Sequence, residues 1–513
     1  RLAAMIGRGD EVQKLGSVLT HLANLGNDLG DEIAAAGWLG ADGHVVGPVA
    51  IAPVADPAGF RAHLASELDQ LQRELGAQGE GHGHLTVVTD ETVGQPAAGP
   101  TAGDELRVWV SDAHRAVVVA CTATAFNGIA AALGDGSQPF RDAPFHATIA
   151  DRYAAGVDGL LAVDLGSMVR AHGGEERERL ERLGLAGVQH LLLEQWSEGT
   201  TQRREAVLSF DGARHGIASW LAAPAPMGAL SFFSPDSTAV AAFVMKEPAL
   251  LLEDVLAGLS PEERERFATD RARFQSEHGW DPLDDLARPL GGEVAMGIDG
   301  PVVPQPAWKV VVEVYAPDRL QSGIERLVAD ADTQLRQHHE GTLTLAAEGD
   351  GWVIQRTREN GTQTPVHYRY QDGYLVASAT AGLVDNALRY RAAGQGLLQS
   401  PRLRALLPPD RELNLSALWY QDLSGVLGPI AGVMKGLQGQ AEGAQQQAMP
   451  APLRDLAKQL GEAGPTAVFA YGEEDKIRLS SSSPRNPLGL IDMLLLKGAG
   501  MGPLAPHGRE AED

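Results

Sequence analysis

Cysteine, aromatic residues and long apolar runs are all scarce in this sequence. Its 513 residues include a single cysteine, Cys121, which excludes an intramolecular disulfide. Because Cys121 lies inside an apolar stretch, we interpret it as a small core residue rather than a reactive thiol. No run of about 18 consecutive apolar residues occurs, so no transmembrane helix is predicted. Hydrophobic residues still make up 44% of the chain, which is enough to build ordinary globular cores.

Positive charge is also in short supply. The chain has 42 Lys and Arg residues against 67 Asp and Glu residues, which gives a formal net charge of −25. An acidic surface repels phosphate backbones, so a nucleic-acid partner is not expected. Basic residues do gather at 177–182 and 402–411, but acidic residues lie among them. We interpret both clusters as solvated helix faces.

An internal duplication is the strongest signal in the chain, whose length already exceeds what one core supports. Val117–Leu133 predicts a buried strand that runs into a helix, and Tyr374–Leu388 predicts the same unit again. The predicted elements on either side of the two units follow in the same order, with Gly37-Trp38 matched to Gly279-Trp280. Each copy is too long for a short solenoid repeat, so we predict a duplicated domain.

The predicted fold class is α+β, with two similar tandem domains, each a mostly antiparallel sheet with helices packed on one side. The first repeat domain covers residues 1–227 and the second 228–497, and 498–513 is predicted to be a flexible tail. Gly228–Met245 predicts a leading strand for the second repeat, whereas the first repeat starts within its first helix. We expect either that a strand preceding Arg1 is missing or that Gly228–Met245 completes the first sheet.

The individual elements are predicted from hydrophobic periodicity and from turn residues. For the first repeat we predict helices at 11–36, 60–75, 126–133 and 175–183, and strands at 45–54, 85–89, 105–110, 116–122, 156–165, 188–196 and 203–210. For the second repeat we predict helices at 250–259, at 261–277 and from 320, strands at 294–298, 309–315, 342–347, 352–356 and 367–370, the strand–helix unit at 374–388, and strands at 414–420, 467–471 and 476–480.

Two groups of side chains are weak candidates for a metal site. His82 and His84 stand two residues apart in a glycine-rich loop, but no third ligand is evident near them. Asp281, Asp284 and Asp285 could hold calcium or perform acid–base chemistry, yet their spacing does not match an EF-hand loop. A helix N-terminus with acidic residues in its first turn explains these aspartates more simply. We therefore predict neither a metal nor a cofactor.

The sequence contains no recognisable catalytic motif. A Gly-x-Ser-x-Gly elbow, a Ser-x-x-Lys set and a Walker loop are all absent. Gly498–Gly502 is glycine-rich but does not connect a strand to a helix, so we reject a nucleotide site there. His338 and His339 are adjacent at a helix end and point in different directions. Glu348–Gly351 is predicted to be a hairpin turn, because Asp-Gly lies there between two strands.

Three short motifs carry a family resemblance. They are Pro235-Asp236 before a strand, Gly279-Trp280-Asp281 ahead of Gly292–Met296, and Tyr420–Leu423. In these motifs the chain resembles a group of uncharacterised bacterial extracytoplasmic proteins that are often tethered at the N-terminus. The resemblance covers most of the chain and implies a periplasmic or otherwise exported location. It implies membrane association only through a segment outside this chain, and it supplies no activity.

Three classes of function therefore stay open. A non-catalytic binding or structural protein, with protein partners, fits the duplication and the lack of a catalytic motif. A carrier would hold a lipid or another apolar ligand where the two repeats meet. An enzyme would need dispersed catalytic residues, which fold alone does not reveal. An exposed apolar patch would favour a binding or structural protein, and an apolar cavity would favour a carrier. A cleft with convergent titratable groups would favour an enzyme.

Overall fold

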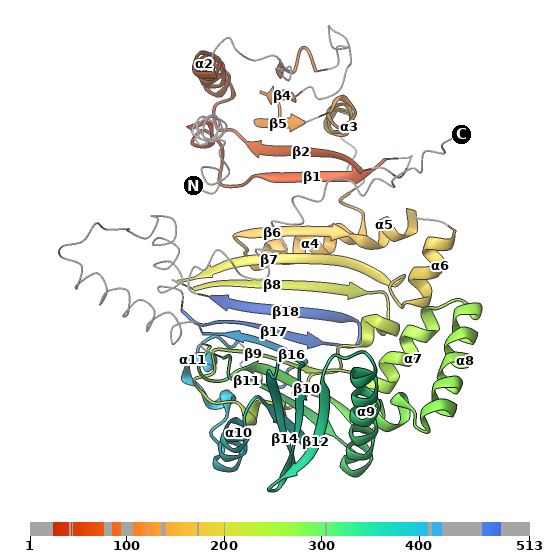
Figure 1. The fold of residues 1–513 in the computed structure, drawn as a ribbon. Coiled ribbons are helices and arrows are strands. Elements are labelled where there is room, and N and C mark those ends of the chain that lie inside the picture. The colour runs from red at the N-terminus through yellow and green to blue at the C-terminus, as the bar shows by residue number, and fades with distance from the viewer. Residues whose placement is uncertain are drawn as a thin grey trace, which may run out of the picture. The chain divides into compact units, whose positions relative to one another are not determined.

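The computed structural model divides the chain into two compact units, Arg1–Ala147 and Thr148–Asp513, which we describe separately (Figure 1). Both units mix helices with sheets, in agreement with the predicted α+β class. No helix among the described residues is long and apolar enough to cross a membrane. The structure describes residues 24–40, 43, 45–75, 85–93, 106–120, 122–134, 140–171, 174–199, 201–302, 305–408, 413–422 and 464–483.

The first unit contains a five-stranded mixed sheet with the strand order β1-β2-β5-β4-β3. Strands β3 and β4 are parallel, and the other neighbours are antiparallel. Helix α2 follows β2 and helix α3 follows β5. The bounds are β1 (Ala34–Leu39), β2 (Val45–Pro53), α2 (Pro57–Leu75), β3 (Leu85–Val88), β4 (Leu106–Ser111), β5 (Ala116–Ala120) and α3 (Ala123–Gly134).

The helices of the first unit cover opposite faces of this sheet. Val118 of β5 packs with Phe126 of α3 in one core cluster, whereas its neighbour Val117 packs with Phe60 and Leu64 of α2 in another. Successive residues of a strand point to opposite faces, so the two helices lie on different sides. The prediction that helices pack on one side was therefore wrong, because β5 is apolar on both faces.

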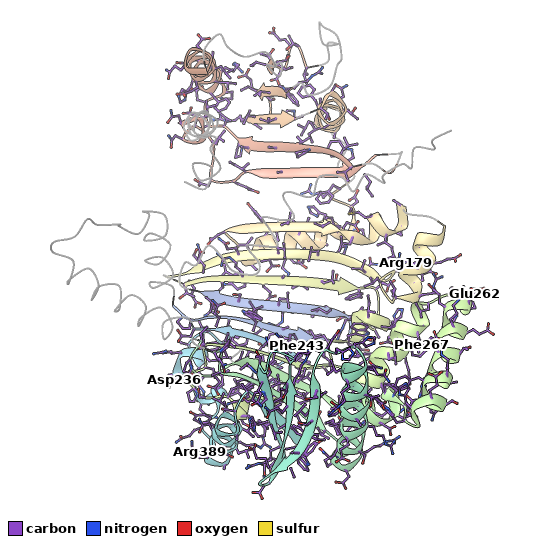
Figure 2. All side chains as sticks on the ribbon, viewed as in Figure 1. Arg179, Asp236, Phe243, Glu262, Phe267 and Arg389 are labelled. Carbon is purple, nitrogen blue, oxygen red and sulfur yellow. The ribbon has the colours of Figure 1, made fainter. Side chains whose placement is uncertain are left out.

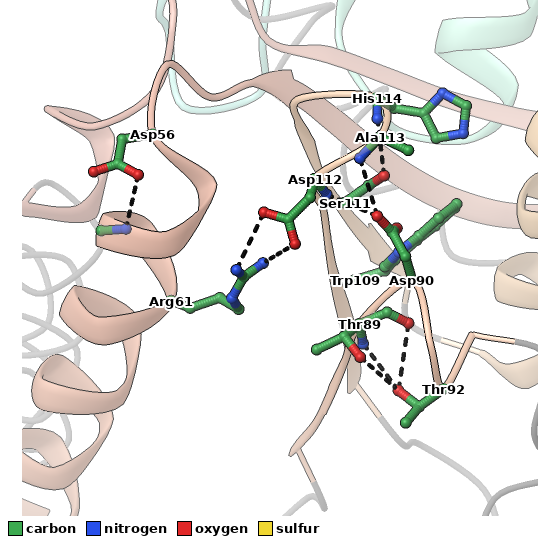
Figure 3. Close-up of polar contacts among 11 residues, drawn as sticks. Asp56, Arg61, Thr89, Asp90, Thr92, Trp109, Ser111, Asp112, Ala113 and His114 are labelled. Carbon is green, nitrogen blue, oxygen red and sulfur yellow. Dashed lines mark hydrogen bonds and ion pairs between the residues drawn. The ribbon is translucent and has the colours of Figure 1, made fainter.

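A carboxylate stabilises the turn between β4 and β5 (Figure 3). Asp90 accepts hydrogen bonds from the Trp109 indole N–H at 2.9 Å and from the amides of Asp112 and Ala113 at 2.9 and 3.0 Å. Arg61 of α2 donates to both carboxylate oxygens of Asp112, at 2.9 and 3.1 Å. Strands β4 and β5 form an antiparallel hairpin, and its turn is fixed by side chains from two other segments.

The second unit contains an antiparallel sheet of thirteen strands, in the order β12-β13-β14-β15-β11-β10-β9-β16-β17-β18-β8-β7-β6. The predicted turn at Glu348–Gly351 is confirmed, since Glu348 and Gly351 pair across it. The strands are β6 (Gly159–Asp164), β7 (Val188–Glu198), β8 (Thr201–Phe210), β9 (Ala239–Val244), β10 (Leu290–Ile298), β11 (Trp308–Val314), β12 (Thr342–Glu348), β13 (Gly351–Thr357), β14 (Gln363–Gln371), β15 (Tyr374–Ser378), β16 (Ala417–Gln421), β17 (Thr466–Gly472) and β18 (Lys476–Ser483).

The helices of the second unit also cover both faces of its sheet. Val384 and Ala387 of α10 pack with Val376 of β15 in the main core. From the other face, Tyr368 of β14 donates a hydrogen bond to Gln321 of α9 at 3.0 Å. The helices are α4 (Pro144–Ala155), α5 (Leu165–Ala171), α6 (Glu175–Arg182), η2 (Gly216–Ser219), η3 (Gly228–Phe232), α7 (Pro248–Gly258), α8 (Pro261–His278), η4 (Leu283–Ala287), α9 (Pro317–Gln337), α10 (Ala381–Ala393), η5 (Leu397–Gln399) and α11 (Pro401–Arg404).

Two element predictions were wrong. Residues 34–36 were predicted to end a helix, but they form β1, in which Ala34 pairs with Ile51 and Ala35 with Ala50. Consequently Trp38 lies within a strand, whereas Trp280 follows the C-terminus of α8, and the two tryptophans do not correspond. Alanine favours helices, but its propensity is weak and the pairing with β2 overrides it here.

The compact units divide the chain elsewhere than the predicted repeats do. Strand β8 pairs with β18, so β6, β7 and β8 belong to the large sheet although they precede residue 228. Gly228–Met245 comprises η3 and β9, and β9 pairs with β10 and β16. The alternative that Gly228–Met245 completes the first sheet was therefore wrong. Residues 498–513, predicted to be a tail, lie outside the described residues.

Candidate interaction surface

The three candidate aspartates lie close together but are bound by arginines and backbone amides. Asp281 is buried and accepts hydrogen bonds from the Arg271 guanidinium at 2.6 Å and from the Leu283 amide at 2.8 Å. Burial alone would raise the pKa of Asp281, but these donors outweigh burial and hold it below its ordinary value. Asp284 pairs with Arg288 at 2.7 Å, and Asp285 accepts from the Asp281 amide at 3.0 Å. This is a helix-start network.

Of the histidines named as candidates, only His338 and His339 lie within the described residues. His82 and His84, like Cys121, lie outside the described residues. His338 ends α9 and borders a hollow of about 360 Å³ between that helix and β12. Within the part of the chain that the structure describes, no three His, Cys, Asp or Glu side chains gather as a metal site would require. The hollow is lined by Ala331, Gln334, Leu335, His338, Glu340, Leu343 and Arg356.

A buried Lys–Asp–Ser cluster superficially looks catalytic. Lys309 of β11 contacts Asp299 at 2.5 Å and donates to the Phe232 carbonyl at 2.8 Å. Asp299 also accepts from the Ser234 amide at 3.0 Å and from the Ser237 hydroxyl at 3.0 Å. The Lys309 side chain is 1% exposed. Its polar contacts are all within the fold, so the cluster fixes the segment before β9 and offers no face to a substrate.

A second buried carboxylate is satisfied in the same way. Glu293 of β10 accepts hydrogen bonds from the Ala229 amide at 2.5 Å and from the Tyr374 hydroxyl at 2.7 Å. Burial raises the pKa of Glu293, and the nearby Glu313 carboxylate adds to this effect. Glu293 lies in the motif Gly292–Met296, so the structural role of this motif is to hold η3 against the sheet.

Three residues form an apolar row across neighbouring strands of the large sheet. Met296 of β10 pairs with Ala241 of β9, and Ala241 pairs with Trp419 of β16. Met296 is 47% exposed and Trp419 is 49% exposed, whereas Ala241 between them is buried. Adjacent strands are about 4.8 Å apart, so the side chains of Met296 and Trp419 stand roughly 10 Å apart, with the small side chain of Ala241 between them. We call Met296, Ala241 and Trp419 the apolar row.

The area around the apolar row is apolar as well. Val310 of β11 pairs with Met296, and Val468 of β17 pairs with Trp419, and both valines are half-buried. Phe243, which is labelled in Figure 2, lies two residues from Ala241 on β9. Side chains alternate along a strand, so Phe243 faces the same side as Ala241. The row thus belongs to a continuous patch over five strands. Exposed apolar patches of this kind commonly mark interaction sites.

The opposite face of the same strands carries the main core of the unit. Val240, Ala242, Ala295 and Leu418 point to that face and are almost fully buried, together with residues of η3, α10, η5 and α11. In Figure 1, α10 and α11 lie on the same side of the strands labelled β9 and β11. The hydrophobic pattern predicts a strand at 294–298. It could not show that Met296 and Trp419 lie in one row on the face away from the core, because the order of strands in a sheet depends on contacts between segments far apart in the sequence.

No family model, curated protein or solved structure matches the chain.

Proposed function

We propose that this chain is a non-catalytic, extracytoplasmic binding or structural protein that acts through the apolar row, and that the partner is a second copy of the chain. The observation that carries the proposal is the pair of large apolar side chains, Met296 and Trp419, which are about half exposed in one cross-strand row. The extracytoplasmic location rests on the family resemblance alone. The buried polar clusters argue against an enzyme, because their charged and hydroxyl groups bind one another inside the protein rather than facing solvent.

The apolar row is suited to self-association by its symmetry. A twofold axis along β9 would bring Met296 of one copy against Trp419 of the other and stack the two alanines. Closed twofold dimers are the commonest soluble assemblies, and their interfaces are self-complementary. Two sheets stack face to face about 10 Å apart, which suits one layer of such side chains on each sheet.

Sedimentation equilibrium over a range of protein concentrations tests the proposal. We expect the natural chain to dimerise, and Trp419→Lys to raise the dissociation constant at least about tenfold, because a central aromatic anchor is lost and a charge is buried. Leu327→Lys is the matched control, since Leu327 of α9 is 44% exposed but lies outside the row. A natural chain that stays monomeric, or an equal loss in both variants, would refute the proposal.

An apolar-ligand carrier, with its ligand where the two repeats meet, is the alternative partner class. The hollow beside α9 lies within the second unit and is lined by His338, Glu340 and Arg356 as well as by apolar side chains. Native mass spectrometry of the freshly purified chain distinguishes the two readings. A co-purifying lipid would favour the carrier, whereas a bare dimer would favour self-association.

We also infer that a unit of four strands and two helices is used twice, once in each compact unit of the chain. The strand order β1-β2-β5-β4 in the first unit corresponds to β10-β11-β15-β14 in the second. Helices α2 and α9 both begin at a proline, Pro57 and Pro317, directly after the second strand of each set. Helices α3 and α10 both follow the third strand, and Thr122 and Thr380 accept the amide three residues later in each case. These agreements of order and capping support a duplication.

A further inference from the structure

His63 of α2 lies between two carboxylates. Its Nδ1 atom is 2.5 Å from a carboxylate oxygen of Asp28, and its Nε2 atom is 3.1 Å from a carboxylate oxygen of Glu67. A neutral imidazole carries a proton on only one ring nitrogen, whereas an ionised carboxylate can only accept. Both contacts are therefore hydrogen bonds only when His63 is protonated and donates from both nitrogens.

The two carboxylates come from different segments of the first unit. Glu67 stands one helical turn after His63 on α2, and its side chain is 8% exposed. Asp28 belongs to residues 24–30, which precede β1. Asn24 of the same segment donates its side-chain amide to both carboxylate oxygens of Glu67, at 3.4 Å each. Protonated His63 thus joins residues 24–30 to α2.

The apolar contacts of residues 24–30 are incomplete. Leu25 and Leu29 pack against the core cluster that contains Phe60 and Leu64 of α2, but both leucines are only partly buried. Segments with few buried apolar contacts open locally at a lower free energy than the core does. The polar contacts of His63 are therefore well placed to decide whether this segment stays on α2.

We propose that His63 is a pH-sensitive latch, which holds residues 24–30 on α2 when its ring is protonated and releases them when the ring is neutral. The observation that carries the proposal is the pair of carboxylates at the two nitrogens of one imidazole ring. The latch lies in the first unit, so it does not depend on the apolar row, which lies in the second.

The charges around His63 set the direction of the pH dependence. Asp28 faces the ring from residues 24–30 and Glu67 faces it from α2, whereas Arg61 donates to the turn between β4 and β5 (Figure 3). The hydrogen bond with Asp28 is the main cause that raises the pKa of His63 above its ordinary value of 6.5. The stabilisation from the latch is therefore complete below pH 6.5 and is lost as the pH rises through the folded pKa.

Hydrogen exchange of the full-length chain between pH 5.5 and pH 8.5 tests the latch, with each rate corrected for the intrinsic pH dependence of amide exchange. The readout is the protection of the Leu29 and Gly30 amides, which donate to the Gly26 and Pro53 carbonyls. We expect this protection to fall at least about fivefold from the lower to the higher pH. Equal protection at the two ends of the range would overturn the proposal.

Two substitutions hold the latch in one state. His63→Gln cannot be protonated, so it should protect these amides weakly at both ends of the range. His63→Arg keeps a permanent positive charge with several donors, so its protection should stay high at pH 8.5.

His114→Gln is the matched control. His114 is another histidine of the first unit, but it packs edge-on against Trp109 at the turn between β4 and β5. This variant should keep the pH dependence of the natural chain. If His63→Gln kept that dependence, or if His114→Gln lost it, the switch would belong to another group and the proposal would be wrong. Dimerisation is measured separately by sedimentation, so failure of the latch can be told from failure of the proposed function.

Discussion

Lys309 and Asp299 form an ion pair inside the second unit. Their charged atoms lie 2.5 Å apart, and the side chains are 1% and 4% exposed. The pair joins β11 to the segment that precedes β9, because Asp299 also binds Ser234 and Lys309 also binds the Phe232 carbonyl. A buried pair of this kind need not stabilise the fold overall, but either charge left alone is costly.

Removing one partner of this pair is expected to destabilise the second unit. Lys309→Met should lower the free energy of unfolding by about 3–5 kcal/mol, because Asp299 would keep an uncompensated buried charge. Adding Asp299→Asn to that variant should restore part of the loss. Urea denaturation followed by circular dichroism provides the comparison. A Lys309→Met loss below about 1 kcal/mol, the range typical of exposed pairs, would contradict the account.

Acid should weaken the same region. Burial alone would raise the pKa of Asp299, but Lys309 and Ser234 outweigh burial and hold it below its ordinary value of 3.8. The folded state therefore releases this proton more readily than the unfolded state does. The resulting stabilisation is complete above pH 3.8 and is lost as the pH falls through the folded pKa.

Denaturation curves measured from pH 5 down to pH 2 test this expectation. The natural chain should lose stability more steeply than Asp299→Asn, which has no carboxylate to titrate at this position. Parallel pH profiles for the two proteins would show that Asp299 does not contribute.

The sequence predicted individual helices and strands better than it predicted which strands are neighbours in a sheet. Hydrophobic spacing predicted α2, α9 and most strands, because proline starts and apolar periodicity are local signals. It failed for β1, where three alanines favour a helix and only pairing with β2 decides otherwise. The apolar row was not predictable, since Met296, Ala241 and Trp419 come together through the order of strands whose residues lie far apart in the sequence.

Glu293 should impose the opposite pH dependence. Burial raises the pKa of Glu293 above its ordinary value of 4.5, so the folded state holds this proton longer than the unfolded state does. Stability from this group is complete below pH 4.5 and falls as the pH rises towards the folded pKa. Glu293→Gln should remove that slope.

Tyr374→Phe provides a matched variant for the same contact. It removes the hydroxyl that donates to Glu293 at 2.7 Å, and should cost about 1–3 kcal/mol while leaving a titratable carboxylate in place. Stability curves between pH 4 and pH 8 separate the two effects. If Glu293→Gln kept the slope of the natural chain, another group would be responsible.

Asp90 should be the most sensitive carboxylate of the first unit. Its donors include the Trp109 indole and the amides of Asp112 and Ala113, so Asp90→Ala leaves at least these hydrogen bonds unmade. We expect a loss of about 2–4 kcal/mol, since one unsatisfied buried group costs about 1–3 kcal/mol and the turn amides are partly exposed to water.

Asp112→Ala is the control in the same turn. Asp112 pairs with Arg61, but its side chain is 58% exposed, and surface pairs contribute about 0–1 kcal/mol. Hydrogen exchange of the β4 and β5 amides measures the local free energy of opening. Asp90→Ala should speed exchange in both strands, whereas Asp112→Ala should leave it nearly unchanged. Equal effects of the two substitutions would mean that charge at the turn, rather than the hydrogen bonds of Asp90, holds the hairpin.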